Sequence, residues 1–352
     1  MSARLGIASA LASAALFGAS TPFAKQLVAG IPPLALAGLL YAASGIALLS
    51  GLAVLRIASP AAAAQRARLA RGDWPWLVAV IAVGGALGPA LLMFGLTRTS
   101  ATSASLLLNL EAVFTALIAW FVFHENAGAR VVAGMALIVA GGVALSWPGG
   151  AGPGFDLGAL SVAGACLCWG LDNNLTRKLS AGDPLLIAGT KGLAAGAANL
   201  ALAATAGLPA LTPAQIAAAA AVGVLGYGAS LVLFMIALRE LGAARTGAYF
   251  STAPFIGAAV SIVLLAETAG PLTGVAAALM AAGVWLHLTE HHAHEHTHEP
   301  LAHTHAHAHD AHHRHDHPQG WDGAEPHTHY HEHGPLVHSH PHYPDVHHRH
   351  RH

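Results

Sequence analysis

Long apolar runs dominate the first 290 residues, and short polar stretches separate them. As α-helices rising 1.5 Å per residue, runs of about 18 to 25 residues cross roughly 30 Å of hydrocarbon. Ten such runs cover residues 5–28, 32–56, 74–97, 102–123, 130–147, 157–178, 184–206, 213–238, 244–266 and 271–288. The pattern predicts an all-α integral membrane protein with about ten transmembrane helices.

Charge supports this prediction and orients the chain. Charged residues make up 9% of the sequence, against about a quarter in a soluble domain. With a cytoplasmic N-terminus, the loops on the outer side contain Lys25 and Arg98. The inner segments contain many more basic residues, namely Arg4, Arg56, Arg66, Arg68, Arg71, Arg130, Arg177, Lys178, Arg239 and Arg245. By the positive-inside rule, we expect a multi-pass protein of a bacterial-type cytoplasmic (inner) membrane with both termini in the cytoplasm. The formal net charge is −1, so a nucleic-acid partner is not expected.

The membrane part contains an internal duplication, which we place at residues 5–147 and 157–288. The residues Ala15-Leu16-Phe17-Gly18 return as Leu167-Cys168-Trp169-Gly170, and the distance from Glu111 to Glu125 equals that from Ala253 to Glu267. Each half has about five spans, and an odd number makes the second copy enter the membrane from the opposite side. Two inverted five-helix repeats are typical of secondary transporters, with the substrate site at the repeat interface.

These residues carry a resemblance to a known family. The aromatic-Gly signature, the run from Leu108 to Glu125 and the matching run through Pro254 to Glu267 resemble the EamA-type ten-helix permeases of the drug/metabolite transporter superfamily. The chain departs from the family pattern at Ala112, where Pro is usual, and at Phe17, where Trp is commoner. The resemblance covers about residues 5–288 and implies transport of a small-molecule solute without naming it.

Ionisable groups inside a bilayer are costly, so each is a candidate for function. Glu111 lies near the middle of the fourth span and has no partner obvious from the sequence, which suits a proton-coupling carboxylate; the alternative is a structural hydrogen-bonded Glu. Asp172 and Lys191 lie at matching depth on consecutive helices, either as a fixed ion pair or as groups that engage substrate. Asn173 and Asn174 flank Asp172 and complete the predicted substrate and ion pathway.

Other positions favour structural roles. Glu125 and Glu267 end their spans and are expected to cap or anchor helices. Gly192 and Gly196 have the four-residue spacing that permits close contact between helices.

Residues 289–352 form a tail of a different composition, since 24 of the 26 His residues lie between His291 and His352. Residues 294–317 recur as 329–352, so the tail is a duplicated unit. It has too little apolar content to bury a core and is expected to be disordered without metal. Neutral imidazole binds Zn, Ni and Co ions. The predicted ligands are His294, His296, His298, His303, His305, His307, His329, His331, His333, His338, His340 and His342.

Three functions remain open at this stage. The first is a permease for a small metabolite or drug-like solute, proton-coupled through Glu111, with a tail that binds divalent metal ions or responds to pH. The second is a Ni, Co or Zn transporter whose tail collects or delivers ions, and the third is a membrane-anchored metal store or sensor. No required cofactor is expected, and a homodimer stays open. The sequence has no phosphate loop, nucleophile–base set or His-Glu-x-x-His motif, so an enzyme is not expected.

Overall fold

The computed structural model describes residues 3–59, 69, 71–123, 128–147, 156–179, 183–289, 293–298, 301–307, 327–333 and 336–341. They separate into two units, Met1–Glu290 and His291–His352. Predictions for Glu125 and His342 fall outside the described residues.

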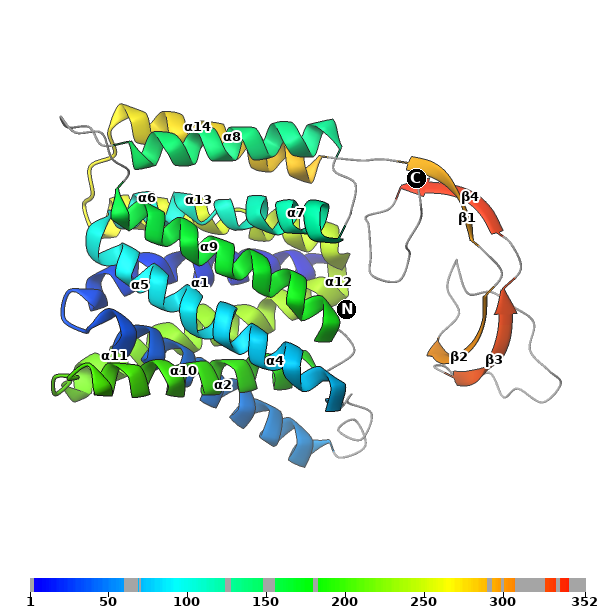
Figure 1. The fold of residues 1–352 in the computed structure, drawn as a ribbon, viewed down its shortest axis with the longest axis horizontal. Coiled ribbons are helices and arrows are strands. Elements are labelled where there is room, and N and C mark those ends of the chain that lie inside the picture. Colours follow the sequence, from blue (N-terminus) through cyan, green and yellow to red (C-terminus); the bar gives the residue numbers. More distant parts are fainter. Residues whose placement is uncertain are drawn as a thin grey trace. The chain divides into compact units, whose positions relative to one another are not determined.

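Every regular element described in the first unit is a helix, and the helices lie side by side (Figure 1). Its first half comprises α1 (Ala3–Val28), α2 (Pro33–Ala58), η1 (Arg71–Asp73), α4 (Trp74–Val80), the π-helical η2 (Ile81–Leu87), α5 (Gly88–Arg98), α6 (Ala101–Leu107), α7 (Leu110–Phe123) and α8 (Ala129–Ser146). Its second half comprises α9 (Leu157–Thr176), η3 (Arg177–Leu179), α10 (Pro184–Thr205), α11 (Pro213–Val222), the π-helical η4 (Gly223–Ala229), α12 (Ser230–Phe250), α13 (Ala253–Leu264) and α14 (Pro271–Leu288).

The helices begin and end where the local chemistry requires it. Pro occupies the first turn of α2, α10, α11, α13 and α14, where its missing N–H costs nothing. Thr212 and Gln215 form a capping box at the start of α11. Inside α12, Gly242 has φ 78° and interrupts the helix, a conformation that glycine adopts without steric cost.

Nine helical stretches in the described residues are long and apolar enough to cross a membrane, compared with the ten predicted. The missing stretch is α9, the expected sixth span. It has 20 residues, which is long enough, but its last turns carry Asp172, Asn173 and Asn174 and lower its apolarity. Three consecutive polar residues therefore lie within an expected span.

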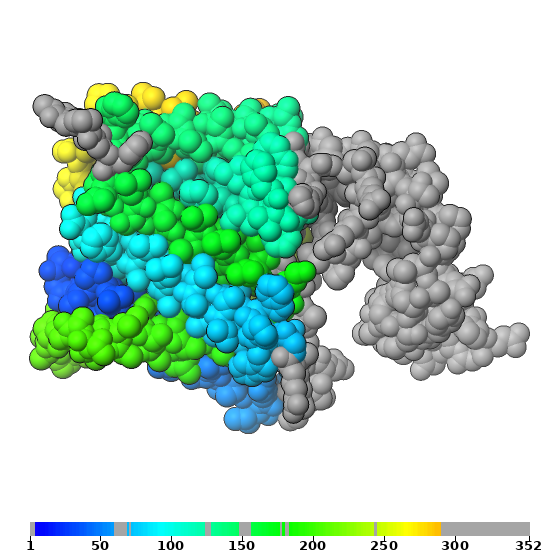
Figure 2. All heavy atoms as spheres, viewed as in Figure 1, coloured from blue at the N-terminus to red at the C-terminus, as the bar shows by residue number. Residues whose placement is uncertain are grey.

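The two halves pack against each other in a pattern that repeats when the halves are exchanged. In the first half α1 packs on α12 and α13, and in the second half the corresponding helix α9 packs on α5 and α7. The face drawn in Figure 2 shows the green α9 segment between the segments of α5 and α7. The other large interfaces, α2 with α10 and α8 with α14, each join a helix to its own counterpart. This exchange is what a fold built from two five-helix repeats requires.

Small residues set the distance between α2 and α10. A Cβ atom added at Gly196 would lie 2.4 Å from the backbone nitrogen of Ala42, and one at Gly192 would lie 2.9 Å from the carbonyl oxygen of Tyr41. The close contact predicted from the spacing of these two glycines is therefore confirmed.

In the second unit the structure describes four short strands, β1 (Ala293–His298), β2 (Leu301–His307), β3 (His327–His333) and β4 (Leu336–Pro341). They form two antiparallel pairs, β1 with β4 and β2 with β3. This differs from the expectation of a tail without regular structure. Paired strands satisfy their backbone hydrogen bonds without an apolar core, and an alternating sequence is compatible with them.

Candidate functional site

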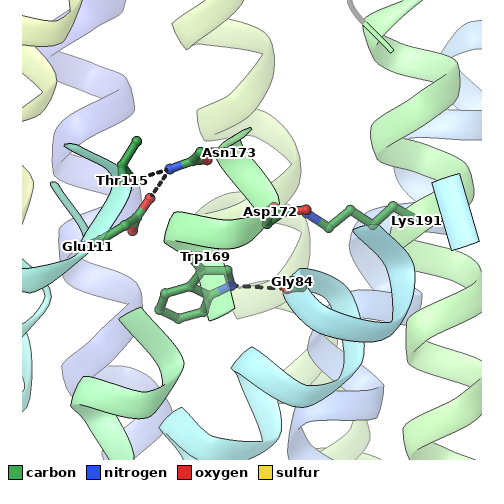
Figure 3. A network of polar contacts seen from close by, with 7 residues as sticks. All are labelled: Gly84, Glu111, Thr115, Trp169, Asp172, Asn173 and Lys191. Atoms are coloured by element: carbon green, nitrogen blue, oxygen red, sulfur yellow. Dashed lines mark hydrogen bonds and ion pairs between the residues drawn. The ribbon is translucent and has the colours of Figure 1, made fainter. Parts of the chain in front are cut away.

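The candidate site is built around the last two turns of α9 (Figure 3). Asp172 and Asn173 are neighbours in the sequence, but about 100° of helical rotation separates their side chains. Asp172 therefore points toward Lys191 on α10, whereas Asn173 points toward Glu111 and Thr115 on α7. One turn of α9 thus holds two polar groups in different directions.

Glu111 has a partner that the sequence analysis did not find. The Asn173 side chain donates from Nδ2 to Glu111 Oε1 at 2.9 Å and to Thr115 Oγ1 at 3.2 Å. Asn173 is exposed, and Glu111 and Thr115 are half-buried. Within the described residues, no Lys, Arg or His forms a salt bridge with Glu111. The Glu111 carboxylate is therefore half-buried near the middle of a span, and no cation pairs with it in the described part of the chain.

Asp172 and Lys191 form an ion pair through Asp172 Oδ2 and Lys191 Nζ. This confirms the prediction that the two residues lie at matching depth. The pair is largely buried, with 9% of the Asp172 side chain and 18% of the Lys191 side chain exposed. The other oxygen, Oδ1 of Asp172, is buried without a hydrogen-bond partner. Asp172 packs against Gly84 in η2, where an added Cβ would lie 2.2 Å from Asp172 Cγ.

Asn174 has a different role from its neighbours. It is 1% exposed, and its Nδ2 donates to the carbonyl oxygens of Gly170 at 2.8 Å and Thr115 at 3.1 Å. Its side chain therefore fixes α9 against α7 and is not accessible as Asn173 is.

The duplicated aromatic-Gly signature has the same packing role in both repeats. Trp169 Nε1 donates to the carbonyl oxygen of Gly84 in η2 at 3.0 Å. Its counterpart Phe17 makes an edge-on ring contact with Tyr227 in η4, with centroids 6.0 Å apart. Each signature aromatic residue therefore contacts the π-helical segment of the other half. π-Helical turns within α-helices are frequent at functional sites.

The two repeats differ in charge at this place. Where Asp172 packs on Gly84 in one half, Ser20 packs on Gly226 in the other. Ala253 is the counterpart of Glu111. The fold is nearly symmetric, but the charged cluster occurs in one of the two equivalent places.

A second polar cluster lies where α5 ends and α6 begins. Glu267 accepts hydrogen bonds from the backbone nitrogens of Ala101 and Thr102, both at 2.8 Å, and from Thr102 Oγ1 at 2.6 Å. The prediction that Glu267 caps a helix is confirmed. Partial burial opposes ionisation of Glu267, but these hydrogen bonds and the charge of Lys25 outweigh it and lower its pKa.

Sequence reasoning missed Thr115 and the contact of Trp169 with η2. Trp169 belongs to the repeated aromatic-Gly signature, and this position is the signal in the sequence that could have indicated its contact. In the described ranges between residues 3 and 289, no group of three or more His, Cys, Asp or Glu side chains is arranged to hold a metal ion.

Comparisons with known proteins agree with the resemblance seen in the sequence. An "Uncharacterized transporter" of Methanothermobacter thermautotrophicus is 30% identical over 228 residues, which are 63% of this chain and 66% of that protein. A Pseudomonas paraeruginosa protein, "Probable 4-amino-4-deoxy-L-arabinose-phosphoundecaprenol flippase subunit ArnE", is 45% identical over 71 residues, 20% of this chain and 59% of its own length. The matches thus span less than two thirds of these relatives.

A crystal structure of another protein shares the fold, with a TM-score of 0.58 at 20% identity, covering 81% of this chain and 97% of that chain. The profile of the EamA-like transporter family matches residues 4–147 and 156–289, one match for each repeat. The chain therefore belongs to the EamA-like transporter family.

Proposed function

We propose that this chain is a secondary permease for a small solute, and that the solute passes Glu111, Asn173 and Thr115. The observation that carries the proposal is the polar cluster between α7 and α9, in which exposed Asn173 contacts half-buried Glu111 and Thr115 near the middle of a span. Such a cluster is costly on a surface that faces lipid, whereas a solute path needs polar groups that replace the water around the solute.

Glu111 is the group that couples transport to protons in this proposal. It lacks a salt-bridge partner among the described residues, so it can change protonation without leaving a buried cation unpaired. Asn173 can accommodate both forms, since its amide donates to the carboxylate and its oxygen can accept from the protonated acid. The Asp172–Lys191 ion pair has a structural role in this proposal, because it joins α9 to α10 and its two charges cancel.

Reconstitution of the full chain with a pH-sensitive dye inside the vesicles tests this function. We would add amino acids, nucleosides, sugar phosphates and organic amines one class at a time and record solute-dependent proton movement. Glu111→Gln should abolish the proton movement, whereas Glu240→Gln, which changes a carboxylate outside the cluster, should retain it. Equal proton movement in both variants would reject the coupling role, and no solute-dependent flux with any class would count against the permease.

Orientation follows from the basic residues, and we propose that both termini are cytoplasmic. With this orientation the Lys25 and Glu267 cluster lies at the outer end of the bundle. Reporter fusions at both termini would test it, and a reporter active outside at either terminus would reject it.

For the tail we propose binding of divalent Zn, Ni or Co ions, from its composition and its strand register. The register places His296 opposite His338 and His303 opposite His331. Because β1 pairs with β4 and β2 with β3, each pair combines one strand from each copy of the duplicated unit. If each strand pair forms a metal site, deletion of one copy would therefore remove the sites of both pairs.

Calorimetric titration of the full chain with Zn²⁺ distinguishes the arrangements. Deletion of 329–352 should abolish the tight binding if the sites are shared. If half the number of Zn²⁺ ions bind at unchanged affinity, the two copies bind metal independently. Unchanged binding would reject a metal site in residues 329–352.

A further inference from the structure

Glu267 joins the two repeats at one end of the bundle. It follows α13 in the second repeat, but its three hydrogen-bond donors, at Ala101 and Thr102, belong to α6 in the first repeat. Both carboxylate oxygens are used, Oε1 by one donor and Oε2 by two. A negative charge at the beginning of a helix is favourable because the unpaired N–H groups there carry partial positive charge.

Lys25 completes this junction from α1. Its Nζ donates to the carbonyl oxygen of Leu96 at 2.6 Å and to that of Thr99 at 2.9 Å. These carbonyls lie at the end of α5, where a cation is favourable because the unpaired C=O groups carry partial negative charge. Lys25 is also close enough to act electrostatically on Glu267. We call Lys25, Thr102 and Glu267 the clasp, because together they join α1, α5, α6 and the end of α13.

The backbone beside Glu267 is strained. Ala266 has φ 51°, and it is the one residue other than glycine with positive φ in the described part of the chain. This left-handed conformation is unfavourable for a residue with a Cβ atom, and it persists where the surrounding contacts hold it. Here it directly precedes the residue that makes the clasp, so the contacts of Glu267 hold the strained turn in place.

The clasp and the polar cluster lie at different levels of the bundle. Gly158, near the start of α9, packs on the backbone of Arg98 and Thr99 at the clasp end. Asp172 lies fourteen residues further along α9, or about 21 Å at 1.5 Å per residue. Near the clasp, Ala24 and Ala101 are fully buried, whereas Asn173 in the polar cluster is exposed.

We propose that the clasp is the tie that keeps this end of the bundle closed, and that it must release before solute enters or leaves there. This inference rests on the proposed function, since a bundle that moves solute between its repeats has to open at each end in turn. Release separates Glu267 from α6 and lets Ala266 leave its strained conformation. The closed state gains the hydrogen bonds of Glu267 but has the strained Ala266 backbone. The open state loses these hydrogen bonds but relieves the strain, so the two states are suited to alternate.

The test uses a buried reporter cysteine in the full chain, reconstituted in lipid vesicles. Ala24→Cys places a thiol at a fully buried position beside the clasp, and the native Cys166 and Cys168 are buried. We would measure the rate of reaction with a membrane-impermeant maleimide present on both faces. Asp156→Asn is the matched control, because the Asp156 side chain caps its own helix by accepting from the backbone nitrogens of Gly158 and Ala159 in the same repeat.

Glu267→Gln should raise the labelling rate of the reporter about tenfold or more. The Gln amide replaces one accepting oxygen with an N–H₂ group, which cannot accept hydrogen bonds from the donors of α6. Asp156→Asn should leave the rate unchanged, and Ala266→Gly, which removes the strain with the tie intact, should not raise it. Equal rates in Glu267→Gln and Asp156→Asn would overturn the proposal. If Glu267→Gln does not fold, Lys25→Met and Thr102→Val provide the same comparison.

The labelling experiment contains no solute, so its result is independent of cargo. Faster labelling with no solute flux would support the clasp and count against the permease. Solute flux with unchanged labelling would support the permease and reject the clasp.

Discussion

Adding one methyl group at Gly84 should separate η2 from α9 and break the Asp172–Lys191 ion pair. In Gly84→Ala the new Cβ would lie 2.2 Å from Asp172 Cγ and 2.4 Å from Asp172 Cβ. Carbon atoms prefer separations of about 3.5–4.0 Å, so the two helices must move apart by more than about 1 Å. Rotation of the Asp172 side chain cannot relieve the clash, because Cβ is fixed to the backbone.

The expected cost combines two effects. Overpacking of a close contact costs about 1–3 kcal/mol, and breaking a buried ion pair costs about 3–5 kcal/mol. The two costs overlap, because movement of α9 relieves part of the clash. We therefore expect the free energy of unfolding to fall by about 3 kcal/mol or more, which lowers Tm by about 6 °C or more.

Tryptophan fluorescence during thermal unfolding in detergent measures this change. Gly51→Ala is the control, because Gly51 lies within α2 and an added Cβ there meets nothing within 4 Å. This control should keep or slightly raise Tm, since Ala favours helix by up to about 1 kcal/mol over Gly. Equal Tm values for the two variants would refute the packing of Asp172 on Gly84.

Further predictions concern the ion pair, Trp169 and the clasp. Lys191→Met should lower Tm more than the double variant Asp172→Asn/Lys191→Met, because the single change leaves a buried carboxylate unpaired; the reverse order by thermal unfolding would contradict the pairing. Trp169→Phe removes the hydrogen bond to Gly84 and should cost about 1 kcal/mol, and no loss of Tm would contradict that bond. Glu267 has a pKa below its ordinary value of 4.5, so its stabilisation is present above that value and is lost as pH falls through the lowered pKa. Tm measured from pH 7 to pH 3 should therefore fall more in the native chain than in Glu267→Gln, in which Lys25 and Thr102 have no titrating partner, and parallel curves would contradict the assignment.

The sequence predicted the features that depend on length, charge and duplication. Helix length was enough for the helical membrane fold, and the resemblance of the repeated motifs to EamA-type permeases was enough for membership of the family. Depth along the chain was enough to predict that Asp172 and Lys191 lie at the same level, because they lie on either side of one short connection between consecutive helices. The position of Glu267 directly after a span was enough to predict a cap.

Features that depend on helix rotation were not predictable in this way. The spans are apolar on all sides, so no hydrophobic stripe showed that Asn173 turns toward Glu111 and Asn174 toward the α7 backbone. The π-helical segments were missed because a widened turn has no sequence period of its own. The expected span at residues 157–178 forms as helix α9, but it is less apolar than the nine other stretches because its last turns carry the polar residues of the candidate site.

Cysteine accessibility at two adjacent positions of α9 tests the central claim, that a solute path passes the cluster at Glu111. Asn173 is exposed and Asn174 is 1% exposed, so Asn173→Cys and Asn174→Cys differ in accessibility at nearly the same depth. In vesicles containing the full chain, a membrane-impermeant thiol reagent should label Asn173→Cys and leave both Asn174→Cys and the native chain unlabelled. Absence of labelling at Asn173→Cys, or equal labelling at the two positions, would contradict a water-accessible path at this cluster.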